Sequence, residues 1–158
     1  MLRALRRPEA VVARVGLLIR QHMRAGQVAA PGQLPTPRAL HRFHGVLGDA
    51  TPDVCVLFLA DSLATAGAEA LLPRWPAYVA HVQRIAAWEP SQAAVRLLGL
   101  VDGHAVMRAT GLAPGPAVGR VLLGLEEAAA AGEVRSEAEA LRLAVDLAAT
   151  EATAGVDE

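Results

Sequence analysis

The chain has 158 residues, of which 53% are hydrophobic and only 3% aromatic, and its formal net charge is −1. Alanine and leucine dominate, and β-branched residues other than valine are few. This composition excludes a β-rich fold and favours an all-α protein, long enough to bury a core.

The charge is unevenly distributed along the chain. Residues 1–24 contain six arginines and one acidic residue, whereas residues 126–158 contain nine acidic residues and two arginines. The basic end indicates an anionic partner, although two solvated faces are the simpler interpretation. No secretory signal or membrane span is visible, so we expect a cytoplasmic protein without membrane contact.

Apolar periodicity, caps and prolines predict a series of helices. The expected fold is all-α, a compact bundle of about six to seven helices. The longer helices are predicted over residues 8–23, 37–48, 52–66, 73–88, 116–132 and 136–149, and shorter ones over 91–100 and 103–110.

The segment 52–66 is apolar on nearly every face, which is typical of a helix that is buried all round. Thr51-Pro52 supplies an N-cap and a first-turn proline, and Gly67 suits the end of the helix. Asp61 shares a face with apolar residues, so we expect a buried carboxylate that needs a partner. Cys55, the only cysteine, is expected to be a buried structural thiol.

Histidines on the two preceding helices are candidate partners for Asp61. His22 lies on the apolar stripe of the first helix, and His44 lies on that of the second, with His41 three residues before it. Three packed helices could bring His22, His44 and Asp61 together. Two imidazoles and a carboxylate suit zinc or manganese and leave a position for an activated water, and His41 could replace or join His44.

Such a metal site would make the chain a small metal-dependent hydrolase of phosphodiesters or phosphotriesters. Arg38 or Arg42 could then hold the anionic substrate. The alternative is a structural Asp61 that is hydrogen-bonded to a histidine or an arginine. His81 and His104 have no matching partners, and we expect them at the surface or its margin.

A Gly-Pro-rich segment and the helices after it resemble the C-terminal signature of bacterial tRNA nucleotidyltransferases, the CCA-adding enzymes and their poly(A) polymerase relatives. The matching strings are residues 111–122, 126–128, 132–134 and 136–141. Upstream, the string 57–62 and the helix that bears His22 resemble the later part of an HD-type domain. The resemblance covers most of the chain, from about residue 8 to residue 147.

This resemblance implies an HD-domain remnant over 1–88, a C-terminal helical tail over 89–150 and a disordered end over 151–158. The family's catalytic head has no counterpart in the sequence. The chain is therefore expected to be a fragment that does not catalyse nucleotidyl transfer on its own. By resemblance, His22 and Asp61 match the later histidine and the final aspartate of an HD metal site.

The resemblance also implies an RNA-binding module, because family members hold the tRNA acceptor end with their helical C-terminal part. The backbone amides at the Gly115-Pro116 helix start could receive a phosphate, with Arg120 one turn further on. Arg96 and Arg108 could extend this strip, which would position RNA without reading its bases. The simpler interpretation is a well-capped helix–helix connector.

A chain that starts inside a domain would expose apolar faces of helices 9–23 and 52–66. Exposed apolar surface of that size tends to be reburied between copies. The sequence therefore predicts a homodimer.

Overall fold

The computed structural model describes residues 7–30 and 32–154. These residues contain no strand, which confirms the all-α prediction. They form ten α-helices, eight of them with at least eight residues, where six to seven were expected. No single helix in the described part is long and apolar enough to span a membrane, and the pair Pro37–Ala66 and Ala68–Ala86 reaches that length only across a bend of 107°.

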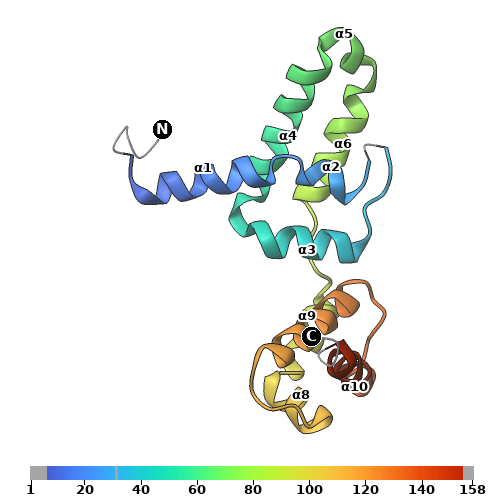
Figure 1. The fold of residues 1–158 in the computed structure, drawn as a ribbon. Coiled ribbons are helices and arrows are strands. Elements are labelled where there is room, and N and C mark those ends of the chain that lie inside the picture. Colours follow the sequence, from blue (N-terminus) through green and yellow to red (C-terminus); the bar gives the residue numbers. More distant parts are fainter. Residues whose placement is uncertain (1–6, 31, 155–158) are drawn as a thin grey trace. The chain divides into compact units, whose positions relative to one another are not determined.

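The chain divides into two compact units, which we call unit 1 (Met1–Trp88) and unit 2 (Glu89–Glu158). The α-helices of unit 1 are α1 (Glu9–Gln21), α2 (Arg24–Val28), α3 (Pro37–Leu47), α4 (Thr51–Ala66), α5 (Ala68–Leu71) and α6 (Trp75–Ala86). Helices α4 and α6 run side by side, α5 joins their far ends, and α3 lies at the opposite end (Figure 1).

The core of unit 1 takes side chains from four of these helices. Ala25 comes from α2, Phe43 from α3, Val54 and Phe58 from α4, and Ile85 from α6, and all are buried. Burying a large apolar side chain contributes about 1.5–3 kcal/mol. These contacts therefore account for the packing of α2, α3, α4 and α6 into one unit.

Two helices of unit 1 start near a threonine. Thr36 is the N-cap of α3, whereas Thr51, the predicted N-cap of α4, does not cap that helix. Thr36 Oγ1 accepts a hydrogen bond from the Ala39 amide at 3.2 Å, and the predicted start of α3 is confirmed. Thr51, in contrast, is not an N-cap, because a 3₁₀ turn (Gly48–Ala50) leads directly into α4 and leaves Thr51 helical. Its hydroxyl is buried and has no hydrogen-bond partner among the described residues.

Helix α4 has the predicted length but not the predicted burial. Only its first half contributes buried residues, and Val56 is 65% exposed. From Leu63 onward every residue of the helix is exposed. The expectation of all-round burial is wrong because alanine supplies much of the apolar character here, and alanine is tolerated on an exposed helix face.

Helix α1 has no buried residue. Leu17 and Leu18 pack against the core as partly buried side chains. Arg14 connects α1 to the start of α4, where it donates to Asp49 Oδ1 at 2.9 Å and to Asp53 Oδ2 at 2.7 Å. The helix thus depends on a polar contact as well as on its apolar edge.

The helices of unit 2 are α7 (Gln92–Leu100), α8 (Gly103–Thr110), α9 (Pro116–Ala130) and α10 (Glu137–Ala154). Three of them begin at a side-chain N-cap. Ser91 Oγ accepts from the Ala94 amide at 3.1 Å, Asp102 Oδ1 accepts from the Ala105 amide at 2.8 Å, and Ser136 Oγ accepts from the Glu139 amide at 3.3 Å. Gly111 ends α8 with φ of 73°, a value that glycine adopts without strain.

Small side chains pack α10 against α9. Ala140, Ala144 and Ala148 form a buried stripe at four-residue spacing on α10. A Cβ added at Gly124 of α9 would lie 2.7 Å from Cδ1 of Leu147, so glycine permits this close approach.

Helix α10 also continues into the predicted disordered end. It runs to Ala154, and the hydroxyl of Thr150 donates to the carbonyl of Asp146 at 3.0 Å. Glu151 pairs with Arg120 of α9, which holds this last turn. The remainder of that predicted end, residues 155–158, lies outside the described residues.

Candidate functional site

The predicted metal ligands His22, His44 and Asp61 all lie in unit 1. Nδ1 of His22 donates to the carbonyl of Ile19 at 2.7 Å, and Nε2 of His44 donates to the carbonyl of Ile85 at 2.8 Å. Between residues 7 and 154, position 31 excepted, no group of three His, Cys, Asp or Glu side chains is placed to hold a metal ion. The structure thus does not bring the three predicted ligands together.

The predicted burial of the Asp61 carboxylate is wrong. Asp61 is half-buried, not enclosed, because the last turns of α4 are open to solvent. No hydrogen bond or ion pair joins Asp61 to any described residue. The alternative, a structural pair with His22 or an arginine, is therefore not formed either. The hydrolase stays a prediction without an assembled ligand set.

His41 and His44 instead belong to an aromatic cluster at the end of α6. The ring centroids of His44 and Trp88 lie 5.2 Å apart, and those of His41 and Trp88 lie 6.1 Å apart in an edge-on arrangement. Together with the bond from His44 to the Ile85 carbonyl, these contacts join α3 to α6. The two histidines thus have a packing role in this structure.

His81, which was expected at the surface, is 1% exposed. Its Nε2 donates to the carbonyl of Ala25 at 2.8 Å, while its Nδ1 is buried without a partner among the described residues. The sequence does contain a signal for this burial. His81 lies three residues after Tyr78 and four before Ile85, so the three residues share one face of α6. His104 is exposed, as expected.

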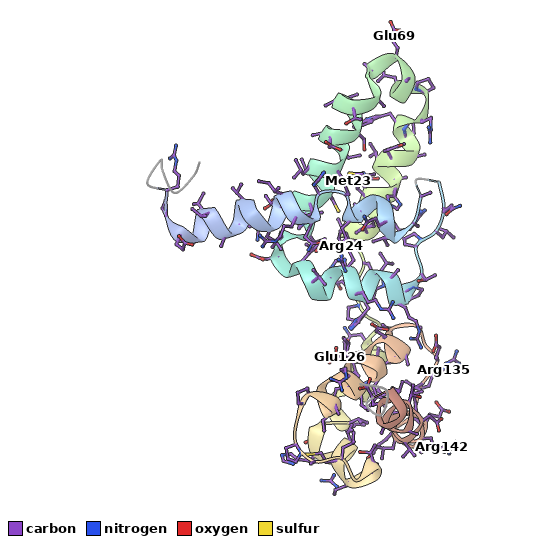
Figure 2. The ribbon with its side chains drawn as sticks, viewed as in Figure 1. Met23, Arg24, Glu69, Glu126, Arg135 and Arg142 are labelled. Carbon is purple, nitrogen blue, oxygen red and sulfur yellow. The ribbon has the colours of Figure 1, made fainter. Side chains whose placement is uncertain are left out.

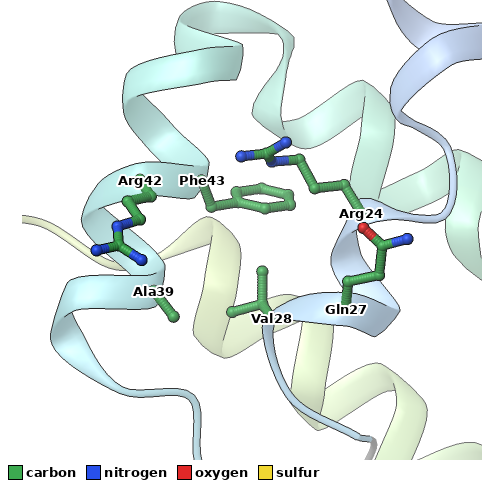
Figure 3. A pocket seen from close by; sticks show the side chains of 6 residues that line it. All are labelled: Arg24, Gln27, Val28, Ala39, Arg42 and Phe43. Carbon is green, nitrogen blue, oxygen red and sulfur yellow. The ribbon is translucent and has the colours of Figure 1, made fainter. Parts of the chain in front are cut away.

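Arginine side chains line a pocket of about 210 Å³ between α2 and α3 (Figure 3). Its lining residues are Arg24, Gln27, Val28, Ala39, Arg42 and Phe43. Arg24 and Arg42 lie on opposite sides of Phe43 in this view. Arg24 donates to the neutral amide oxygen of Gln21 at 3.3 Å, a bond that does not offset its charge. Arg42 thus borders a pocket that suits an anion, whereas Arg38 does not line it.

The predicted RNA-binding residues all lie on exposed positions of unit 2, namely Arg96 on α7, Arg108 on α8, Arg120 on α9 and Gly115 before α9. Arg120 donates to Glu151, so much of its charge is offset. The hydrogen bond from Ala105, with smaller effects of His104 and Arg108, lowers the pKa of Asp102. Arg108 therefore lies near a carboxylate as well.

The helix start at Gly115 is a weaker anion site than predicted. Pro116 has no N–H, and the amide of Val118 donates to the carbonyl of Gly115 at 3.1 Å. Few amides remain for a phosphate in this first turn, chiefly that of Ala117. The arginine side chains therefore matter more than the helix terminus for any phosphate contact in unit 2.

The two units differ in charge. By sequence, unit 1 has ten arginines and five acids, whereas unit 2 has five arginines and eleven acids. A polyanion is therefore attracted to unit 1 and, apart from local arginines, repelled by unit 2. The RNA contacts predicted by resemblance lie in unit 2, whereas Arg24 belongs to the basic stretch of residues 1–24.

The described part of the chain is thus all-helical, with exposed arginines on both units. In sequence the chain is similar to the CC-adding tRNA nucleotidyltransferase of Thermus thermophilus, with 37% identity over 137 residues. It is also similar to the A-adding tRNA nucleotidyltransferase of Deinococcus radiodurans, with 37% identity over 142 residues. No family model matches the chain, and no solved structure matches it significantly.

These matches take in 86% and 89% of the chain but 28% and 30% of the two relatives. The chain is thus a relative of the tRNA nucleotidyltransferases, and the resemblance to these enzymes identified in its sequence is confirmed. The HD-type domain stays a prediction. It spans less than a third of the length of either enzyme.

Proposed function

We propose that the chain binds the phosphate backbone of tRNA through exposed arginines. The observation that carries this proposal is the 37% identity to two enzymes that are named for acting on tRNA. Guanidinium groups donate paired hydrogen bonds to phosphate oxygens, and such contacts position RNA without reading its sequence.

In unit 2, Arg96 and Arg108 are the main candidates for these contacts. Both are exposed, and no hydrogen bond or ion pair joins Arg96 to any described residue. Arg120 contributes less because Glu151 offsets its charge, and Gly115 contributes only a weak helix terminus. The predicted strip is therefore reduced to two strong positions.

In unit 1, Arg24 and Arg42 form a second candidate contact. They border the same pocket from two helices, in the unit with the positive net charge. A phosphate in this pocket would contact guanidinium groups from two helices. This pair is therefore a contact that the distribution of charge favours.

The experiment is a titration of tRNA at several salt concentrations with two double variants, Arg96→Gln/Arg108→Gln and Arg24→Gln/Arg42→Gln. Each lost phosphate contact reduces the slope of log affinity against log salt by about 0.7–0.9, so a double variant should lose about 1.4–1.8. Arg142, an exposed arginine on the acidic helix α10 (Figure 2), provides the matched control. Arg142→Gln should change neither the tRNA affinity nor its salt dependence.

Unchanged affinity and slope in both double variants would contradict the proposal. A loss in only one of them identifies the unit that carries the contacts. An unrelated RNA hairpin, titrated in parallel, separates general backbone binding from a preference for tRNA.

We also propose the homodimer, supported by apolar side chains on the surface of unit 1. Ile19 is 63% exposed and Met23 is 50% exposed, in addition to Val56 on α4. A second copy that covers these side chains would remove them from water. A monomer mass by light scattering at micromolar concentration, with no change on dilution, would contradict this.

A further inference from the structure

A second pocket, of about 310 Å³, lies between α2, α4 and α6 on a different set of side chains from the arginine pocket. Those that the argument uses are Met23, Phe58, Asp61, Ser62, Thr65 and Tyr78. Its size falls at the lower end of the range for small-molecule sites, which is about 300–1,000 Å³. Nothing in the proposed RNA contact uses these residues.

One wall of this pocket is aromatic. The rings of Phe58 and Tyr78 are stacked, with centroids 5.9 Å apart and an angle of 11° between their planes. The guanidinium carbon of Arg74 lies 5.7 Å from the centroid of the Tyr78 ring, so this ring already attracts a cation. The thioether of Met23 adds a flexible apolar surface.

The polar group of the pocket is the carboxylate of Asp61. It is half-buried and has no hydrogen bond or ion pair with any residue that the structure describes. Partial burial without a partner is unfavourable for a carboxylate, and a cation that enters the pocket removes this cost. The hydroxyls of Ser62 and Thr65 on the same helix can accept further hydrogen bonds from this cation.

These features select the class of ligand. An anion would be repelled by Asp61, and a neutral apolar molecule would desolvate that carboxylate without pairing it. We propose that the pocket binds a small aliphatic primary amine in its ammonium form. The ammonium group pairs with Asp61, and the alkyl chain lies along Phe58 and Tyr78.

The test is calorimetric titration of the full chain with n-hexylammonium and with n-hexanol, its neutral counterpart. The amine should bind at least about tenfold more tightly than the alcohol, because only the amine pairs with the carboxylate. Asp61→Asn should weaken amine binding by about tenfold or more and leave the alcohol unaffected. Glu69→Gln removes the same charge at the tip of unit 1 (Figure 2) and should leave both unaffected.

A second variant keeps the test independent of Asp61. Ala66 lines the pocket on an exposed position, so Ala66→Trp should close it without disturbing the core and should abolish binding. Equal affinity for amine and alcohol, no effect of Asp61→Asn, or no saturable heat with the amine would overturn the proposal.

Discussion

Gly26 allows α2 to lie directly on the Phe58 ring, and one added methyl group there should change the stability of unit 1. A Cβ at this position would lie 2.9 Å from Cε2 of Phe58. That ring is buried and packed between Tyr78 and His81. Overpacking of this kind costs about 1–3 kcal/mol. Alanine regains about 1 kcal/mol over glycine within a helix, so Gly26→Ala should lower the free energy of unfolding by about 0–2 kcal/mol.

A second background, Phe58→Leu, tests whether the Phe58 ring causes this loss of stability. In Phe58→Leu the methyl group meets a smaller side chain, so Gly26→Ala should there raise the free energy of unfolding by up to about 1 kcal/mol. Urea unfolding followed by tryptophan fluorescence measures both changes, because Trp75 and Trp88 are the only tryptophans and both belong to unit 1. A stabilisation of the same size in both backgrounds would refute the close approach.

Three further outcomes are expected. Burial raises the pKa of Cys55 to about 11, so a thiol reagent at about pH 8 should label it in denaturant but scarcely in the folded protein. The pKa of Asp102 is lowered by its bond from Ala105, so its stabilising effect is present above its ordinary pKa. The free energy of unfolding should therefore fall more steeply for the unmodified chain than for Asp102→Asn as the pH drops from about 5 to about 2. Glu151→Gln should release Arg120 and raise tRNA affinity, measured by the salt titration.

Each of these outcomes has a control or a contrary result. Rapid labelling of folded Cys55 would show that the thiol is not enclosed by the core. Parallel pH curves for the unmodified chain and Asp102→Asn would show that the cap is not formed. Asp146→Asn removes one charge from α10 without touching Arg120, so an equal gain in tRNA affinity would attribute the effect of Glu151→Gln to net charge alone.

Local signals predicted most of the helices. Thr36, Ser91, Asp102 and Ser136 each cap a helix that was predicted from the sequence. A cap is a contact between residues three positions apart, so its geometry is set by the neighbouring sequence. The predicted N-cap at Thr51 is wrong because a preceding 3₁₀ turn keeps the backbone helical at this residue. No residue pattern at that position reveals such a turn.

Burial was predicted less well because it depends on which helix faces which. The apolar run over α4 was read as a core helix, yet only its first half contributes buried residues, and Asp61 is only half-buried. His81 was read as a surface residue, yet α2 packs over it. The distances between helices determine which side chains meet in a site, and the sequence of one helix alone does not give those distances.

The residues beyond Trp88 contain no phenylalanine, tyrosine or tryptophan, so the hydrophobic core of unit 2 has none of these rings. Without ring currents, its methyl groups should give closely spaced signals in NMR spectra, while those of unit 1 are dispersed. Alanine carrying ¹³C in its methyl group would place three reporters of α10, at positions 140, 144 and 148, in this core.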